Sequence, residues 1–195
     1  AAAGGADGFL ATYGLIKSFK DDFGNAGVIL RADGGASSLR TPMTPLSLVY
    51  SPEDAVRIGA DAMLCMGYPG SADNEQTLEY LAALCAEGDR LGLPVACRQG
   101  AELGADFIKA EYVGGESFKE ITQSCYVPIL VPGGAKEKSS EEIFAGIRGA
   151  LEGGAKGIIM GRNIYRQPNI AKMCAAIAAL VHDDISVPQA LSMIQ

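Results

Sequence analysis

Hydrophobic and polar positions follow two alternating patterns along this chain, and together they predict repeated strand–helix units. Short apolar runs indicate buried strands, whereas longer stretches with apolar residues three or four positions apart indicate amphipathic helices. The predicted strands are residues 8–12, 28–31, 62–66, 94–97, 105–108, 127–131 and 157–160. The clearest predicted helices are residues 52–59, 75–91, 140–153 and 171–181. Strands that alternate with helices in this way predict a parallel α/β fold.

A three-residue phrase recurs before every second predicted strand. It reads Gly5-Ala6-Asp7, Gly59-Ala60-Asp61, Gly104-Ala105-Asp106 and, with a lysine in third place, Gly154-Ala155-Lys156. A glycine at a helix end suits the left-handed backbone conformation that lets the chain turn into a strand. This repetition favours a (β/α)8 TIM barrel, formed as a single domain over residues 1–195, over an open doubly wound sheet. The open sheet remains the alternative, because periodicity does not decide whether a sheet closes.

Two features indicate that the printed chain is an incomplete barrel. A full barrel has eight strands and about 250 residues, whereas the pattern yields seven strands in 195 residues. Between Cys97 and Ala105 only residues 98–104 remain, fewer than the roughly 10–12 that a parallel crossover with its helix needs. We therefore expect a first strand and a segment near 97/98 to be absent, and the chain as printed not to make this connection. A genuinely shortened variant is the alternative.

Lys109 follows the apolar strand within the stretch Glu102 to Tyr112. A lysine at the carboxyl end of a buried parallel strand lies where such folds place their chemistry. An amine in a dry pocket has a lowered pKa, and the neutral nitrogen can attack a carbonyl to form a Schiff base. The alternative is a lysine whose ammonium group simply reaches solvent.

Two glycine-containing loops follow the last two predicted strands. Gly133 and Gly134 come after residues 127–131, and Gly161 and Arg162 come after residues 157–160. Glycines let backbone N–H groups approach an anion, and an arginine adds a full charge. Each loop alone could be a plain turn, but together they favour phosphate binding, which barrels place after strands seven and eight.

Arg31 ends the strand 28–31 on the same predicted edge. It could contact substrate, or it could pair with Asp33 in a purely structural role, and the sequence leaves both open.

Composition excludes several partners and mechanisms. The net charge is −7 with acids and bases interspersed, so we expect neither nucleic acid nor a membrane as a partner. Five cysteines far apart and a single histidine, His182, favour a reduced, cytoplasmic protein without a metal site. The single histidine, near the end of the chain, also leaves no Ser-His-Asp or Cys-His arrangement.

The segments ELGADFIKAEY, VPGGAK and MGRNIY, in this order, resemble the archaeal-type class I aldolases, the DhnA-like family. The resemblance implies a Schiff-base lysine at Lys109 and a ketose-phosphate substrate such as fructose 1,6-bisphosphate. It also implies phosphate bound by Gly133, Gly134, Gly161 and Arg162, no cofactor, and a homo-oligomer built from rings of five, including decamers.

Two other functions stay open within this resemblance. The segments LRADGGASSL and YSPEDAVRIGADA are most similar to a family member from autoinducer degradation, a coenzyme A dependent thiolase that cleaves a phosphorylated dione. A non-catalytic barrel that binds a phosphosugar is the other alternative. The family's Asp-His-Gly phrase and its Tyr-Pro-Arg motif are not printed, so we expect the general acid–base group in the absent segments.

Overall fold

The computed structural model describes residues 1–34, 47–67, 73–97, 100–133 and 139–195. Within these ranges, seven strands follow one another in the hydrogen-bonded order β1-β2-β5-β6-β7-β8-β9. Their bounds are β1 Gly8–Ala11, β2 Gly27–Arg31, β5 Ala62–Cys65, β6 Val95–Cys97, β7 Phe107–Lys109, β8 Ile129–Pro132 and β9 Gly157–Ile159. A separate antiparallel pair consists of β3 Asp33–Gly34 and β4 Ser47–Leu48.

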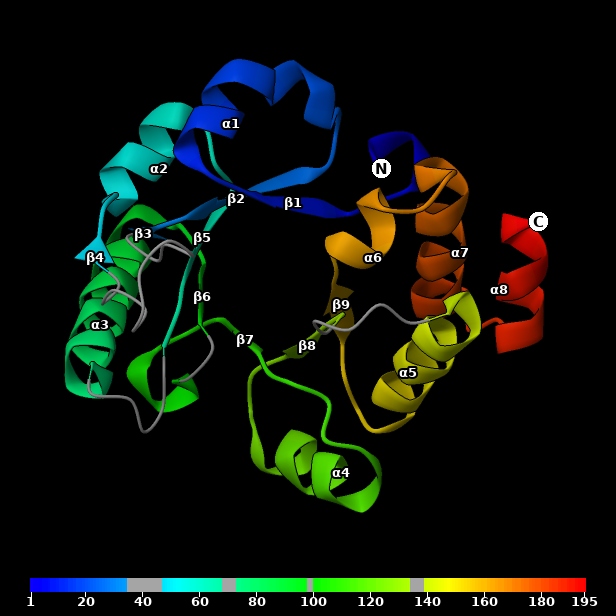
Figure 1. The fold of residues 1–195 in the computed structure, drawn as a ribbon. Helices are drawn as coiled ribbons and strands as arrows, with labels where there is room; N and C mark the ends of the chain where they lie inside the picture. The colour runs from blue at the N-terminus through cyan, green and yellow to red at the C-terminus, as the bar shows by residue number, and fades with distance from the viewer. Residues whose placement is uncertain (35–46, 68–72, 98–99, 134–138) are drawn as a thin grey trace. The chain divides into compact units, whose positions relative to one another are not determined.

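Helices separate most of these strands along the chain (Figure 1). The α-helices are α1 Tyr13–Phe19, α2 Pro52–Ile58, α3 Asn74–Leu91, α4 Gly115–Ser124, α5 Ser140–Glu152, α6 Arg162–Tyr165, α7 Ile170–His182 and α8 Val187–Ile194. Three short 3₁₀ helices are η1 Ala2–Gly4, η2 Lys20–Phe23 and η3 Ala101–Leu103. No helix in the described part of the chain has both the length and the apolar character needed to cross a membrane.

The predicted strand and helix pattern is confirmed, with small shifts at the element ends. All seven predicted strands and the four named helices are present. The largest shifts concern the strands predicted over residues 105–108 and 127–131, which span Phe107–Lys109 and Ile129–Pro132 instead. Ala105 and Asp106 still belong to the turn, because their N–H groups donate to Gly100 and Val95. Lys109 is therefore the last residue of β7 rather than the first residue after it.

The described residues form two compact units, Gly8–Ile108 and Ala1–Asp7 together with Lys109–Gln195. We call them the Gly8–Ile108 unit and the Lys109–Gln195 unit. The single-domain assignment of the whole chain stays a prediction.

The Gly8–Ile108 unit contains a parallel sheet with helices along one side. Strands β1, β2, β5, β6 and β7 pair in parallel in that order, and α1, α2 and α3 lie on its outer side (Figure 1). Buried apolar residues such as Leu30, Met63 and Leu81 form its core. Burial of a leucine-sized side chain contributes about 1.5–3 kcal/mol, so the strand–helix contacts stabilise this unit.

The Lys109–Gln195 unit contains β8 and β9, paired in parallel, and the helices α5, α7 and α8 that lie beside one another (Figure 1). Phe144, Ile147, Met173 and Leu180 are buried between these helices. The amino-terminal η1 packs on α7, where Gly4 adjoins the Ala171 carbonyl. The chain is further held there by His182, whose Nε2 lies 3.0 Å from Asp7 Oδ2.

The predicted start of α5 is confirmed by its capping geometry. Ser139 is the N-cap residue, and its hydroxyl accepts a hydrogen bond from the Glu142 N–H at 3.2 Å. The Glu142 carboxylate accepts in return from the Ser139 N–H at 2.8 Å. This reciprocal pair satisfies two N–H groups that the helix itself leaves unpaired.

The recurring Gly-Ala-Asp phrase leads from a helix end into the next strand, and its aspartate bonds to the strand before it in the sheet. Gly59 is left-handed, with φ of 76°, and Ala60 is buried. The Asp61 N–H donates to the Val28 carbonyl at 2.7 Å, and its carboxylate accepts from the Val28 N–H at 2.8 Å. Asp106 makes the same pair of bonds with Val95, at 2.9 and 2.7 Å. The phrase therefore leads into one strand, while its aspartate carboxylate accepts an N–H near the start of the neighbouring strand.

We expected the printed chain to be too short to connect β6 and β7 as parallel neighbours, but the two strands pair in the structure. Ala96 pairs with Phe107 in parallel, and the only helix described between the strands is η3. The crossover estimate assumed a full helix, whereas here one 3₁₀ turn, closed by Gly104 at φ of 91°, returns the chain to the sheet. The parallel pairing is thus made without a covering α-helix in the described part of this segment.

Candidate active site

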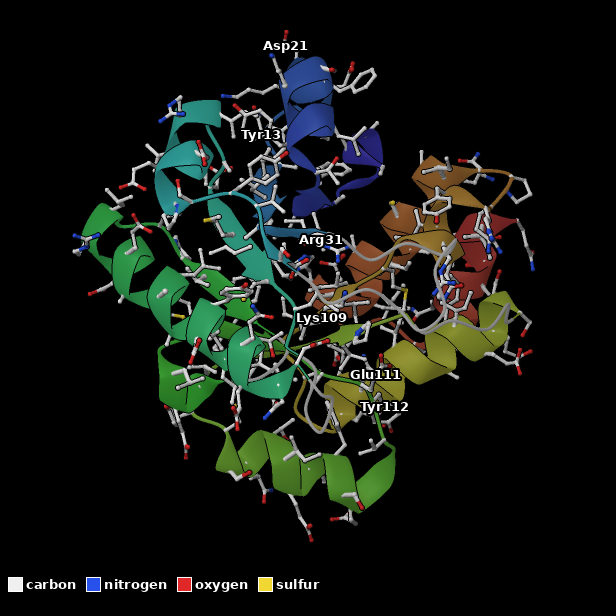
Figure 2. The ribbon with its side chains drawn as sticks, turned by 60° about the vertical axis from the view of Figure 1, so that its left-hand side comes forward. Tyr13, Asp21, Arg31, Lys109, Glu111 and Tyr112 are labelled. Atoms are coloured by element: carbon white, nitrogen blue, oxygen red, sulfur yellow. The ribbon has the colours of Figure 1, made fainter. Side chains whose placement is uncertain are left out.

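Lys109 lies at the carboxyl end of β7, and its side chain is partly buried. The next residue, Ala110, donates its N–H to the Leu130 carbonyl of β8 at 3.1 Å. In a parallel ladder this bond sets Lys109 beside Leu130, on the same face of the strands. The chain then runs through Glu111 and Tyr112 as it leaves the strand (Figure 2).

The two predicted phosphate loops follow the neighbouring strands in the same unit. Gly133 comes directly after β8, while Gly161 and Arg162 follow β9 and begin α6. Because β8 and β9 are parallel, with Val131 opposite Ile158, both loops leave the same edge of the strands. Lys109 ends β7 at that edge too. These four residues therefore lie at the same edge of three neighbouring strands, in the order β7, β8 and β9. The other predicted residue, Gly134, lies outside the described residues.

The backbone of Gly133 is already paired. Its N–H donates to the Ile159 carbonyl at 3.2 Å, and its carbonyl accepts from the Asn163 side-chain amide at 2.6 Å. A Cβ atom at this position would lie 2.7 Å from Met160 Cγ. Glycine at 133 thus permits close packing of the two loops, a role that its sequence motif did not reveal.

A small pocket adjoins this edge, between the strands and α5. Glu111, Pro132, Gly133 and Met160 are among the residues that line it, and its volume is about 110 Å³. Glu111 follows Lys109 by two residues, but Lys109 is not among the described residues that line this pocket. We did not assign Glu111 a role from sequence, although it lies within the stretch Glu102 to Tyr112.

Tyr112 also lines this pocket, and its ring packs against α4 and α5. Its ring lies 5.1 Å from that of Phe118, edge to face. Its hydroxyl is so close to α5 that a Cβ atom at Gly149 would lie 2.7 Å from it. The tyrosine therefore holds the chain after β7 against the helix.

Arg31 belongs to the Gly8–Ile108 unit, and there it pairs with Asp33. The Arg31 Nε lies 2.7 Å from Asp33 Oδ1, and the other carboxylate oxygen of Asp33 accepts from the Met66 N–H. Asp33 is buried, so its charge needs these partners. Of the two alternatives for Arg31, the pairing with Asp33 is confirmed, and a substrate contact stays a prediction.

Within the part of the chain that the structure describes, no three histidine, cysteine or carboxylate side chains gather into a metal-binding group.

A parallel α/β chain with a lysine at a strand end and glycine-containing loops after the next two strands fits the barrel aldolases. The model of the DeoC/LacD family aldolases matches residues 1–97 and 94–167. The chain therefore belongs to the DeoC/LacD family of aldolases, and its fold class is that of their (β/α) barrels. The match breaks at Cys97, which is where we expect a segment to be absent.

Named relatives have several activities. The chain is 32% identical over 212 residues to the 2-amino-3,7-dideoxy-D-threo-hept-6-ulosonate synthase of Halobacterium salinarum, covering 97% of this chain and 79% of that one. It is 31% identical over 203 residues to the 3-hydroxy-5-phosphonooxypentane-2,4-dione thiolase of Klebsiella pneumoniae, covering 94% and 68%.

A solved archaeal fructose-1,6-bisphosphate aldolase is similar in structure. That enzyme was captured with its catalytic lysine covalently bound to the carbinolamine intermediate of the substrate. The TM-score is 0.83 at 29% sequence identity, covering 92% of this chain and 80% of that one. The similarity extends over most of both chains.

Proposed function

We propose that this protein is a class I aldolase that cleaves a ketose phosphate such as fructose 1,6-bisphosphate, with Lys109 as the imine-forming amine. The observation that carries the proposal is the placement of Lys109, Gly133 and Arg162 at the ends of three successive strands, with all three residues in the Lys109–Gln195 unit. A nucleophile, Lys109, and a cationic group suited to an anion, Arg162, thereby follow neighbouring strands at the same edge. The lysine-bound intermediate of the similar archaeal aldolase supports the assignment.

The chemistry follows from the amine. A neutral Lys109 nitrogen attacks the ketone carbonyl, and loss of water gives an imine that is then protonated. The protonated imine accepts the electron pair of the breaking C–C bond, so an aldehyde leaves and an enamine stays on Lys109. Protonation of the enamine carbon and addition of water release the second product and restore the amine. The sequence predicts phosphate binding by Gly133, Gly134, Gly161 and Arg162. The Gly133 N–H already donates to the Ile159 carbonyl, so in this proposal Gly134, Gly161 and Arg162 bind the phosphate.

Proton transfer needs an acid–base group within reach of the substrate hydroxyl. Among the described residues, Glu111 supplies a carboxylate two residues beyond Lys109, in the pocket that also contains Gly133. The resemblance to the family favours instead a group in the segments that we expect to be absent near 97/98 and before the first strand.

The proposal is tested by aldol cleavage of fructose 1,6-bisphosphate with the variant Lys109→Arg. Arginine keeps the positive charge but does not form an imine, so we expect turnover to fall to background. Lys156→Arg is the matched control, because Lys156 precedes β9 and lies at the opposite end of the strands. Full activity in Lys109→Arg would contradict the proposal.

The coenzyme A dependent thiolase is a second candidate, favoured by the 31% identity to the Klebsiella thiolase. It would cleave a phosphorylated dione by acyl transfer to the thiol. Assays with and without coenzyme A separate the two reactions: aldol cleavage proceeds without it, whereas the thiolase forms product only when it is supplied.

The family resemblance further supports a homo-oligomer of rings of five for this proposed enzyme.

A further inference from the structure

Asn163 lies where the loops after β8 and β9 meet. It follows Gly161 and Arg162 in the first turn of α6, and its side chain is 9% exposed. A buried amide is stable only when its polar atoms are paired. The pairing here is the 2.6 Å hydrogen bond from Asn163 Nδ2 to the Gly133 carbonyl, across 30 residues of sequence.

This bond completes a set of contacts that fixes Gly133 to the β9 side. The Gly133 N–H is held by Ile159, and its carbonyl is held by Asn163. Space around Gly133 is small, because a Cβ atom there would lie 2.7 Å from Met160 Cγ and 3.1 Å from Asn163 Nδ2. A shift of either loop therefore breaks a buried hydrogen bond or a close contact.

The turn that carries Asn163 is itself held by backbone bonds. The Gly161 carbonyl accepts from Ile164 at 2.8 Å and from Tyr165 at 3.0 Å. Arg162 lies inside that turn, so the position of its backbone is set by the same bonds. A single side-chain amide thus links the loop that begins at Gly133 to the turn that presents Arg162.

We infer that Asn163 is a positioning residue for the substrate phosphate: through its bond to the Gly133 carbonyl it holds the Gly161–Arg162 turn against the end of β8, and so fixes Arg162 and the N–H groups of that turn where the phosphate binds. This inference rests on the proposed phosphate site. Anion binding depends on donors that are fixed in place before the ligand arrives, so loss of the link weakens phosphate binding. Lys109 is joined to β8 by a different bond, from Ala110 to Leu130, and keeps its place.

The test compares Asn163→Leu with two other variants. Leucine has a similar size but no donor, whereas Asn163→Gln keeps an amide and serves as the conservative variant. Thr122→Val is the matched control, because Thr122 Oγ1 on α4 donates a 2.7 Å hydrogen bond to the Gly153 carbonyl in the same unit. It removes a comparable side-chain-to-backbone bond away from the two loops.

Two measurements separate phosphate binding from imine formation. The first is the KM for fructose 1,6-bisphosphate together with inhibition by inorganic phosphate. The second is the rate of borohydride trapping with dihydroxyacetone, which forms the imine without a phosphate.

We expect Asn163→Leu to raise the KM and the phosphate inhibition constant about tenfold, as the loss of one net hydrogen bond implies. Trapping with dihydroxyacetone should be unchanged, Thr122→Val should resemble the wild type, and Asn163→Gln should fall between.

Three results would overturn the inference, and they differ in what they say about the function. If the wild-type protein turns over a ketose phosphate but Asn163→Leu and Asn163→Gln keep its KM and phosphate inhibition, then Asn163 does not position the phosphate loops. If inorganic phosphate does not compete with substrate in the wild type, the proposed phosphate site is wrong and the role of Asn163 falls with it. Equal losses with dihydroxyacetone and with the phosphorylated substrate would also contradict the inference.

Discussion

Asp61 and Asp106 show what single residues of the Gly-Ala-Asp phrase contribute. Each carboxylate accepts an N–H near the start of the neighbouring strand, from Val28 and Val95 respectively. Val28 and Val95 are both buried, so their N–H groups depend on these partners. In these two copies of the phrase, the third residue is therefore a structural acceptor.

Substitution of Asp61 by alanine should destabilise the fold. It leaves the Val28 N–H without its acceptor, and an unpaired buried N–H costs about 1–3 kcal/mol. We expect the free energy of unfolding, measured by urea titration, to fall by that amount. Glu79→Ala, on the exposed face of α3, is the control and should change stability by no more than about 0.5 kcal/mol. Equal effects of the two substitutions would contradict the role given to Asp61.

Glu53 on α2 and Glu87 on α3 form a carboxyl–carboxylate pair that makes stability depend on pH. A hydrogen bond with Glu53 raises the pKa of Glu87, and the same bond lowers the pKa of Glu53. A group with a raised pKa in the folded state stabilises the fold below its ordinary pKa. That contribution is lost as the pH rises through the raised value. Above the raised pKa of Glu87 both carboxylates are charged and repel one another.

Glu87→Gln should remove this repulsion. Its amide donates to Glu53 at every pH, so we expect the melting temperature at pH 7 to rise slightly above that of the wild type. At pH 4 the two proteins should melt alike, because the wild-type Glu87 then holds its proton. A variant that is less stable than the wild type at pH 7 would contradict the pairing.

At the scale of elements, two helical glycines have opposite surroundings. Gly88 of α3 is buried against the start of β6, and a Cβ atom there would lie 2.7 Å from the Leu93 carbonyl oxygen. Gly146 lies in the middle of α5, and a Cβ atom there would meet nothing within 4 Å. The same substitution is therefore expected to have opposite effects in the two helices.

We expect Gly146→Ala to stabilise the protein by up to about 1 kcal/mol, because alanine has a higher helix propensity than glycine. Gly88→Ala should destabilise it by about 1–3 kcal/mol, because the backbone of Leu93 must move away. Denaturant unfolding of both variants measures the difference. Stabilisation by both substitutions would show that α3 does not pack closely on the start of β6.

The elements themselves were predictable because their signals are local. Each strand is a short apolar run, and several junctions carry a left-handed glycine, such as Gly59, that is visible in the sequence. The start of β7 was placed less accurately, because Asp106 is taken up by bonds to Val95 that link residues 11 apart.

The candidate site was predictable only in part. Lys109 and Arg162 stand out as charged residues directly after apolar runs. The link between Asn163 and Gly133 spans 30 residues and depends on strand order, so no local pattern indicates it. The crossover length after Cys97 was estimated for a full helix, whereas the described part contains only η3, and the family match divides at the same place, into residues 1–97 and 94–167.

At the scale of the whole molecule, the proposed enzyme is expected to assemble into rings of five. Sedimentation equilibrium of the purified protein should give a mass of five or ten times the 20.2 kDa chain. A monomer at micromolar concentration would contradict the assembly but not the chemistry at Lys109, because all the described groups proposed for the imine and the phosphate belong to one chain.

The central claim is that Lys109 forms an imine with substrate, and borohydride reduction tests it most directly. Borohydride delivers a hydride to the imine carbon and leaves a stable secondary amine, so protein incubated with dihydroxyacetone phosphate should gain one adduct per chain. Peptide mass spectrometry should place that adduct on Lys109 and leave Lys156 unmodified. Protein that cleaves a ketose phosphate yet carries no adduct on Lys109 after reduction would contradict the mechanism.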